Sequence, residues 1–388
     1  MYELSKEELE KMGAVITTGE ICRQPELWQE VIDMYKNNKV LIKEFLDKVK
    51  AKAGGRVRVI FTGAGTSQYV GNTVVSYLNL HGDNGSFIFQ SVGTTDIVAS
   101  PEEYLFKHEP TLLVSLARSG NSPESVAAVE IANKYVENIH HLTITCAKEG
   151  ELAKNAGGDP NNLLLLMPDR SNDKGFAMTG SFSCMALSCL LVFDQTAIDK
   201  KSDYVRALIE LGKEVIQREK EIKQLIDCDY DRIVYLGSGS LAGLTREAQL
   251  KVLELTAGKI ATVFDSSMGF RHGPKSFVDN KTLVFDFVNN DPYTRQYDID
   301  ILEEVHADDI AAQVAAIAQP GAIKFTGKTF EFAACKTLLP DGYLALADVM
   351  FAQTVALHSS IKVGNTPDTP SPTGTVNRVV KGVTIHSF

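Results

Sequence analysis

Apolar residues along this chain gather in short runs that end at glycine-rich turns, and one such arrangement occurs twice. The first copy is Val59–Thr62 followed by Gly63-Ala64-Gly65, and the second is Ile233–Leu236 followed by Gly237-Ser238-Gly239. Each run is rich in β-branched and aromatic residues and leads into a stretch with helical periodicity, which is typical of a buried parallel strand that feeds a helix. The repeat predicts two α/β lobes.

Further apolar runs alternate with helical stretches around these two turns, and this alternation indicates doubly wound parallel sheets with helices on both faces. The fold class is therefore α/β, with two such sheets, a helical N-terminal segment and an extended C-terminal tail. The expected strands lie near Val59–Thr62, Phe87–Phe89, Thr111–Leu116, Leu142–Thr145 and Leu163–Met167 in the first lobe, and near Arg232–Leu236, Ile260–Phe264 and Thr282–Phe287 in the second.

The same pattern sets the expected domain bounds. We expect the helical segment over residues 1–50, the first domain over 51–200, the second over 215–363 and the tail over 364–388, with a charged helix around 204–225 between the domains. Prolines exclude helix and central strand from the start of the tail. The apolar residues behind them predict that the tail packs on the protein, namely Val379, Val380, Val383 and Ile385.

The composition of the chain argues against several classes of protein. The chain has 388 residues, 44% of them hydrophobic, and a net charge of -10, which argues against a nucleic-acid partner because phosphate backbones are bound by basic faces. Its six cysteines form no C-x-x-C pair, and the sequence shows neither a signal peptide nor an apolar run of about 18 residues. We therefore expect a cytoplasmic protein with no membrane partner, and the sequence calls for neither a metal nor a cofactor.

Two turns of the first lobe carry hydroxyl groups where a phosphate could bind. Thr66 and Ser67 follow the first Gly-x-Gly turn, and the strand near 111–116 ends in Arg118-Ser119-Gly120-Asn121-Ser122 before a proline suited to a first helical turn. Helix N-termini at the carboxyl edge of a parallel sheet are anion sites. A dinucleotide site is disfavoured because Gln68 replaces the third glycine of that fingerprint. We expect the turn of the second lobe to be structural.

The second lobe offers acid/base groups. Lys251 and Glu254 are three residues apart, so they share a face if this segment is a helix, although such a pair is usually a solvated ion pair. His272 lies between Gly269 and Gly273-Pro274, a setting that presents a side chain, although a lone loop histidine is more often structural than catalytic. The residues alone leave both interpretations open.

Taken together, these motifs resemble the sugar isomerase (SIS) family in its two-domain form, as in the isomerase half of glucosamine-6-phosphate synthase. More closely, the chain resembles the bacterial galactosamine-6-phosphate deaminase/isomerase family, also described as tagatose-6-phosphate ketose/aldose isomerases. The resemblance covers nearly all of the chain beyond residue 50. The motifs that carry it are Gly65-Thr66-Ser67, Arg118-Ser119-Gly120-Asn121-Ser122, Lys251-x-x-Glu254, His272-Gly273-Pro274 and the segment Asn377–Thr384.

The resemblance implies a role for each motif. Both hydroxyl-bearing motifs of the first lobe would bind the sugar 6-phosphate, while Glu254 would move the proton and His272 would open the sugar ring. In the synthase this histidine comes from the neighbouring subunit, so the resemblance implies a homodimer or higher homo-oligomer. Lys381 on the tail would reach the site, and it or Lys251 would stabilise the developing oxyanion or form a Schiff base. The chain departs from the synthase at Ala117-Arg118, where the synthase has serine and glutamine.

Three functions stay open on this basis. The first is a deaminase/isomerase that converts an amino sugar 6-phosphate, galactosamine 6-phosphate, to tagatose 6-phosphate and ammonia. The second is a ketose/aldose isomerase that acts on tagatose 6-phosphate without deamination, and the third is a non-catalytic sugar-phosphate sensor. The synthase's glutaminase cysteine has no counterpart here, since Tyr2 follows the initiator methionine. Glutamine-dependent synthesis is therefore not expected.

Overall fold

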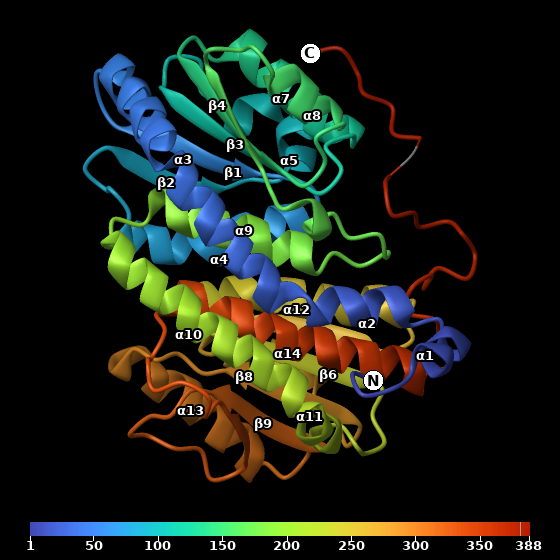
Figure 1. Cartoon of the computed structure of the whole chain (residues 1–388). Helices are drawn as coiled ribbons and strands as arrows, with labels where there is room; N and C mark the ends of the chain where they lie inside the picture. Colours follow the sequence, from blue (N-terminus) through green and yellow to red (C-terminus); the bar gives the residue numbers. More distant parts are fainter. Residues whose placement is uncertain (381) are drawn as a thin grey trace. The chain divides into compact units, whose positions relative to one another are not determined.

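The computed structural model describes residues 1–380 and 382–388, and it divides the chain into two compact units. The first-sheet unit consists of Leu27–Asp173, Gly180–Lys201 and Val376–Phe388. The second-sheet unit consists of Met1–Glu26, Lys174–Thr179 and Ser202–Thr375. Each unit is built around one five-stranded parallel sheet (Figure 1).

The first sheet has the strand order β2-β1-β3-β4-β5 with all strands parallel. Two of its three interior strands, β1 and β3, are buried at every residue because helices cover both faces of the sheet, which explains their continuous apolar sequences. The strands are β1 Val57–Thr62, β2 Phe87–Ser91, β3 Thr111–Ala117, β4 Ile139–Thr145 and β5 Asn162–Leu166.

Helices pack on both faces of this sheet (Figure 1). One face carries α4 (Thr66–His81) and the fully buried α9 (Gly180–Phe193), and the other carries α5 (Thr94–Ala99), α7 (Pro123–Tyr135) and α8 (Glu151–Ala156). The unit also contains the short helix α6 (Pro101–Tyr104) and most of α3 (Gln24–Ala53). This arrangement confirms the doubly wound fold expected for the first lobe.

The second sheet has the order β10-β9-β8-β6-β7, which repeats the winding of the first sheet with β6 in the place of β1. The strands are β6 Arg232–Gly237, β7 Ala261–Ser266, β8 Thr282–Phe287, β9 Gln313–Ala318 and β10 Lys328–Glu331. The sequence pattern had not indicated the last two. Strand β9 is rich in alanine, a helix-favouring residue, and β10 has only four residues, so tertiary pairing rather than local propensity defines both.

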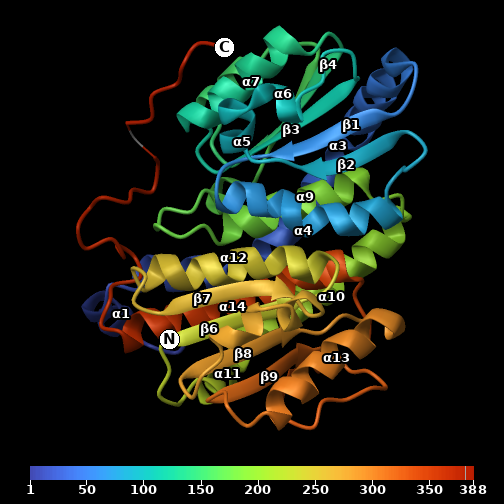
Figure 2. The ribbon, with the colours of Figure 1, turned by 180° about the vertical axis from the view of Figure 1, so that it is seen from behind.

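The helices of the second-sheet unit also lie on both faces of their sheet (Figure 2). Helices α12 (Ser240–Leu255) and α14 (Asp341–Lys362) pack on one face, and α13 (Pro292–Ala307) packs on the other. The expected charged helix around 204–225 is two helices, α10 (Ile198–Gln217) and α11 (Glu219–Leu225), and the N-terminal helices α1 (Lys6–Met12) and α2 (Val15–Cys22) belong to the same unit.

Helix α14 is long and apolar enough to cross a membrane by length and composition alone. Its most apolar window is 89% buried within the protein, and its Phe351 contacts the rings of Phe285 and Phe330 from the sheet. These contacts identify α14 as a core helix of the second-sheet unit.

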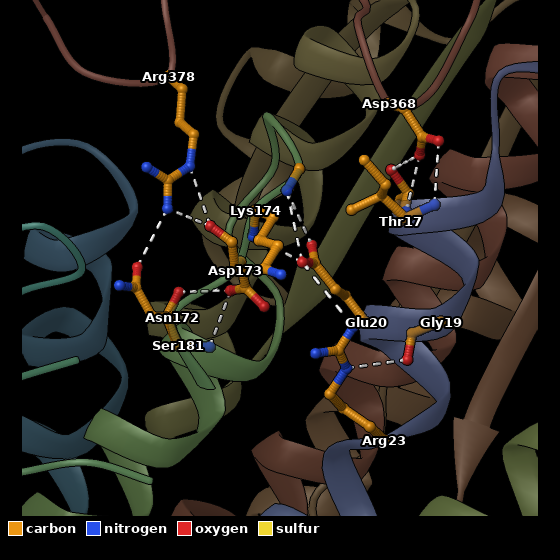
Figure 3. A network of polar contacts seen from close by, with 12 residues as sticks. Thr17, Gly19, Glu20, Arg23, Asn172, Asp173, Lys174, Ser181, Asp368 and Arg378 are labelled. Carbon is orange, nitrogen blue, oxygen red and sulfur yellow. Dashed lines mark hydrogen bonds and ion pairs between the residues drawn. The ribbon is translucent and has the colours of Figure 1, made fainter. Parts of the chain in front are cut away.

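The C-terminal tail is extended, as the prolines predict, but the expectation that its apolar residues are buried was wrong. Val380, Val383 and Ile385 are 49%, 36% and 37% exposed. The tail is held mainly by polar contacts instead. In the second-sheet unit, Asp368 accepts hydrogen bonds at the start of α2 from the backbone N–H and the hydroxyl of Thr17, both at 2.8 Å (Figure 3).

Candidate active site

The turn between β1 and α4 has a backbone that only glycine accommodates easily. Gly65 has φ 57° and ψ -127°, outside the regions open to other residues, and a Cβ on Gly63 would lie 2.6 Å from the Cβ of Ser67. The turn therefore brings Thr66 and Ser67 into the first turn of α4, where both are almost fully buried. Backbone N–H groups and the helix dipole at such a position favour an anion.

The second turn of the first sheet lies directly beside the first. Thr62 at the end of β1 pairs with Ser115 of the adjacent β3, so both strands end at the same edge of the sheet. In the order β2-β1-β3-β4-β5 the chain winds away in opposite directions from β1 and β3, and the crevice at such a switch point is the usual ligand site of open α/β sheets. Ser122 is the N-cap of α7 and makes no side-chain cap bond, and Pro123 is the first helical residue.

Three predicted substrate-binding residues of this loop also make contacts within the first-sheet unit. The amide oxygen of Asn121 accepts a hydrogen bond of 2.9 Å from the N–H of Glu151, at the start of α8. The guanidinium of Arg118, which is 7% exposed, donates through Nη2 to the backbone oxygen of Arg378, at 2.7 Å. Ser119 Oγ accepts from the backbone N–H of Asn121 at 3.4 Å. The loop is thus tied down on both sides of Gly120.

The equivalent turn of the second sheet has the same backbone but holds a carboxylate of the protein. Gly239 has φ 60° and ψ -128°, within a few degrees of Gly65. Here Asp341 Oδ2 accepts from the N–H of Ser240 at 3.0 Å. The next helix, α13, is capped by Asp291, which accepts from the backbone N–H groups of the first turn at 2.9 and 3.1 Å. Both helix N-termini of this sheet therefore carry the protein's own anions, which supports the expectation that this turn is structural.

Helix α12 carries a buried row of alternating charges. Lys251 Nζ lies 2.6 Å from Glu254 Oε2 and 3.2 Å from Glu247 Oε1. The side chains of Lys251 and Glu247 are fully buried, and that of Glu254 is 22% exposed. Burial alone would lower the pKa of Lys251, but the two carboxylates raise it above its ordinary value. The arrangement presents Glu254 at the surface with a charged ammonium behind it.

Glu247 was not among the residues singled out in the sequence. It precedes Lys251 by four residues and Glu254 by seven, so all three occupy one face of α12. That spacing was the signal available in the sequence. It could have suggested a charge row, but it could not have shown that the face is buried, because a row of charges usually marks a solvated face.

His272 is exposed on the loop after β7, as its glycine and proline neighbours predict. The loop is fixed by the two cations on either side of the histidine: Arg271 Nε lies 2.5 Å and Lys275 Nζ lies 2.6 Å from the carboxylate of Glu304 on α13. These contacts lower the pKa of Glu304. Gly273 has φ 123°, which other residues rarely adopt. The imidazole is thus presented on a rigid loop.

The predicted site residues divide between the two units. The phosphate-binding candidates, Gly65 to Ser67 and Arg118 to Ser122, belong to the first-sheet unit, and the acid/base candidates Lys251, Glu254 and His272 belong to the second-sheet unit. Lys381 lies outside the described residues, so its predicted role stays a prediction. Within the first-sheet unit the two candidate loops follow the adjacent strand ends of β1 and β3, and within the second-sheet unit Lys251 and Glu254 form an ion pair, whereas no contact joins His272 to either of them among the described residues.

Two α/β units whose parallel sheets share one strand order, the first with two helix N-termini beside hydroxyl-bearing residues, are the architecture of the two-domain SIS class. In agreement, residues 55–193 match the SIS domain family. The chain is 44% identical over 376 residues to the D-galactosamine-6-phosphate deaminase AgaS of Escherichia coli, with 96% of each chain covered. The chain belongs to the AgaS family.

Solved structures show the same relationship. A candidate tagatose-6-phosphate ketose/aldose isomerase from Clostridium novyi matches with a TM-score of 0.89 and 43% identity, covering 100% of this chain and 99% of the other. The tagatose-6-phosphate ketose/aldose isomerase from Escherichia coli matches with a TM-score of 0.86 and 41% identity over 96% of each chain. The resemblance found in the sequence motifs is thereby confirmed, and it places a small sugar phosphate among the ligands of this chain's relatives.

Proposed function

We propose that this protein is a deaminating isomerase that converts galactosamine 6-phosphate and water to tagatose 6-phosphate and ammonia. The observation that carries the proposal is the Lys251–Glu254 pair on α12, in a chain that shares 44% of its residues with a D-galactosamine-6-phosphate deaminase. A half-buried carboxylate held at 2.6 Å from an ammonium is suited to moving a proton between neighbouring carbons.

The reaction would start with the sugar phosphate held at the carboxyl edge of the first sheet. The N-termini of α4 and α7, with the hydroxyls of Thr66, Ser67, Ser119 and Ser122, would bind the phosphate. His272 would transfer a proton between the C1 hydroxyl and the ring oxygen, which opens the ring and exposes the C1 aldehyde.

Glu254 would then take the proton from C2, which leaves a 1,2-enolamine, and return a proton to C1. The product is a C2 imine, and water adds to this imine to give the ketose and release ammonia. Lys251, buried behind Glu254, would orient the carboxylate, and Lys381 would stabilise the developing oxyanion. Each proton removed is returned within the sequence, so the reaction needs no redox partner.

A coupled assay tests the proposal. The purified protein is incubated with galactosamine 6-phosphate or glucosamine 6-phosphate while ammonia and ketose phosphate are measured together. We expect equal amounts of both products from the galacto substrate. Glu254→Gln should keep the inhibition constant for inorganic phosphate but lose exchange of the C2 proton with solvent, whereas the surface variant Asp229→Asn should behave like the unmodified protein. Exchange at the unmodified rate in Glu254→Gln would remove Glu254 from this role.

The second candidate is a ketose/aldose isomerase that releases no ammonia. It is favoured by the two related structures described as tagatose-6-phosphate ketose/aldose isomerases. Glu254 and His272 would serve it in the same way, because C2-to-C1 proton transfer is common to both reactions. Interconversion of tagatose 6-phosphate and galactose 6-phosphate, without ammonia from either amino sugar, would establish this reaction instead.

We also propose that the protein acts in the cytoplasm as a homodimer or higher homo-oligomer in which His272 is supplied by the neighbouring subunit. The exposure of His272 on a loop fixed by Arg271 and Lys275 supports this proposal. Subunit mixing tests it: inactive Glu254→Gln and His272→Asn proteins are combined and allowed to exchange. Activity should return, because a mixed dimer with a shared site contains one intact pair. Persistent inactivity after verified exchange would place both residues in one subunit.

A further inference from the structure

Two buried carboxyl groups meet at the carboxyl edge of the second sheet. Asp286 lies on β8 and Asp298 lies on α13, and both are fully buried. Ser267, the first residue after β7, joins them: its hydroxyl lies 3.1 Å from Asp286 Oδ2 and 2.6 Å from Asp298 Oδ1. Ser238, in the turn between β6 and α12, lies 2.5 Å from Asp298 Oδ1 and 3.2 Å from the hydroxyl of Ser267. Four segments of the second-sheet unit therefore converge on one hydrogen-bond network.

This network has more contacts than its hydroxyl groups have hydrogens. Each of the two serines supplies one hydrogen, whereas three of the four contacts join a hydroxyl to a carboxyl group. If both carboxyl groups were ionised, one of these three contacts would bring lone pairs together. One additional hydrogen on a carboxyl group removes this conflict, because a protonated carboxyl group can donate to a hydroxyl oxygen.

The partners of the two carboxyl groups favour Asp286 as the one that carries this hydrogen. Asp298 accepts from both hydroxyls through Oδ1, and through Oδ2 it accepts from the backbone N–H of Asn289 at 2.9 Å. Among the described residues, by contrast, Asp286 Oδ1 is buried and has no hydrogen-bond partner. A buried oxygen without a partner costs much less on a neutral carboxyl group than on a carboxylate.

The charges around the pair act in the same direction. Burial and the nearby Asp298 raise the pKa of Asp286 well above its ordinary value, outweighing the hydrogen bond from Ser267. The residues paired with Asp286 on β6 and β9 are Leu236 and Ala316, which carry no charge. Burial also raises the pKa of Asp298, but there the hydroxyls, the backbone N–H and the charge of Arg295 on α13 oppose it.

We propose that Asp286 carries a proton in the folded protein, and that the chain of hydrogen bonds from Asp286 through Ser267 to Asp298 positions the loop over residues 267–275, which presents His272. Asp286 donates to the oxygen of Ser267, and Ser267 donates to Asp298, so every contact between a hydroxyl and a carboxyl group contains one hydrogen. The proton stays in place during the reaction. The positioning role rests on the function proposed above, whereas the protonation of Asp286 does not.

Ser267 is the anchor at the start of this loop. Its backbone N–H donates to the oxygen of Gly237 at 3.0 Å, so both its main chain and its hydroxyl are bound. The fully buried ring of Phe270 follows three residues later, and His272 two residues after that. The phosphate-binding candidates belong to the other unit. Loss of the hydrogen-bond chain should therefore affect catalysis by His272 and leave phosphate binding unchanged.

Infrared spectroscopy identifies the protonated group. Spectra of the unmodified protein, Asp286→Asn and the surface variant Asp229→Asn are recorded at pH 7 and compared in the C=O stretching band of protonated carboxyl groups, which carboxylates lack. We expect the band to lose intensity in Asp286→Asn and to stay unchanged in Asp229→Asn. An unchanged band in Asp286→Asn would overturn the protonation of Asp286.

The pH dependence of unfolding provides a second measurement of the same proton. Because the folded pKa of Asp286 is raised, its contribution to stability is present at low pH and is lost as the pH rises. Unfolding of the unmodified protein releases this proton, and unfolding of Asp286→Asn does not. The unfolding equilibrium constant of the unmodified protein, relative to that of Asp286→Asn, should therefore rise about tenfold per pH unit between about pH 5 and pH 7. A ratio that does not change with pH would contradict the assignment.

Kinetics and hydrogen exchange test the positioning role. Ser267→Ala and Asp286→Ala break the chain, and we expect each to lower kcat for galactosamine 6-phosphate by about tenfold or more. KM and the inhibition constant for inorganic phosphate should change by less than about threefold. Amides of the loop should exchange at least about tenfold faster. Asp286→Asn should recover most of the kcat lost in Asp286→Ala, because its neutral amide can still donate to Ser267. If Ser267→Ala fails to fold, Asp286→Ala carries the same comparison.

The positioning role requires a lower kcat and faster exchange together, so it is overturned if either stays unchanged in the variants that break the chain. It is also overturned if KM and the inhibition constant for phosphate rise together. A failure of the proposed function looks different: the unmodified protein would release no ammonia from any hexosamine 6-phosphate, whereas the infrared band and the exchange rates of the loop would still respond to the substitutions.

Discussion

Removal of the ammonium of Lys251 is the most informative perturbation of helix α12. Lys251→Met keeps most of the length of the side chain but removes the ammonium that lies 3.2 Å from the fully buried carboxylate of Glu247. Removing one partner of a buried ion pair typically costs about 3–5 kcal/mol. Glu254 contributes less to this cost because part of its side chain reaches solvent. We therefore expect Lys251→Met to lower the free energy of unfolding by about 3–5 kcal/mol.

The double variant Glu247→Gln/Lys251→Met removes both buried charges and keeps similar volumes. Because replacing a buried pair as a whole is often nearly neutral, we expect its free energy of unfolding to lie within about 1 kcal/mol of the unmodified protein. Urea unfolding followed by circular dichroism at pH 7 measures both values. A double variant as unstable as Lys251→Met would show that Glu247 is not the source of the loss.

The same double variant separates folding from catalysis. It should be folded, yet Glu254 no longer has an ammonium at 2.6 Å to orient it. We expect kcat to stay at least about tenfold low, which corresponds to about 1.4 kcal/mol of lost transition-state stabilisation. A double variant with full stability and full activity would refute the role of Lys251 as the residue that orients Glu254.

Three further predictions follow from individual positions. Gly65→Ala forces a strained backbone and should weaken inhibition by inorganic phosphate, whereas Gly239→Ala, with the same backbone angles, should reduce thermal stability but leave phosphate inhibition unchanged. Asp341→Ala removes an anion from the N-terminus of α12 and should cost about 1 kcal/mol in urea unfolding, with no loss measured if the contact is unimportant. Burial raises the pKa of Asp348 well above its ordinary value, so its contribution to stability is present at low pH and is lost as the pH rises. Asp348→Asn should therefore raise the melting temperature more at pH 8 than at pH 5, and an equal shift at both would contradict this assignment.

Local chemistry explains which parts of the fold the sequence could predict. The strands beside each Gly-x-Gly turn were found because the apolar run, the glycines and the following helix are adjacent in sequence. The hydroxyl groups of the phosphate loops were found for the same reason. Strand β9 was missed because six residues with three alanines carry no clear β signal until neighbouring strands pair with them.

Contacts between distant residues explain what the sequence could not predict. Asp341 lies 101 residues from the N–H of Ser240 that it binds, and Arg378 lies 260 residues from Arg118. Nothing in the local sequence of either residue indicates its partner. The tail was misjudged for a related reason: its valines suggested apolar burial, whereas Asp368 and Arg378 hold it through hydrogen bonds to backbone and side-chain groups.

The Gly-x-Gly turns of the two sheets share one backbone conformation, but the helices that follow them carry different side chains. Gly65 and Gly239 are 174 positions apart and have the same dihedral angles, so helices α4 and α12 can be compared position by position. The face of α12 that carries Glu247, Lys251 and Glu254 corresponds on α4 to Thr73, Tyr77 and Leu80, none of which is charged.

The two sheets also differ in the charges at their helix N-termini. At the second sheet Asp341 and Asp291 accept hydrogen bonds from the first-turn N–H groups, so a phosphate dianion would meet like charges there. At the first sheet the N-cap residues Gly65 and Ser122 are uncharged, and the one acid in these two first turns is Glu124 of α7. The acids at the helix N-termini of the second sheet disfavour an anion there, and the charge row along α12 contains the residue that we propose as the acid/base group. These two differences between the sheets support the proposal that the phosphate binds at the first sheet and that Glu254 on α12 transfers the proton.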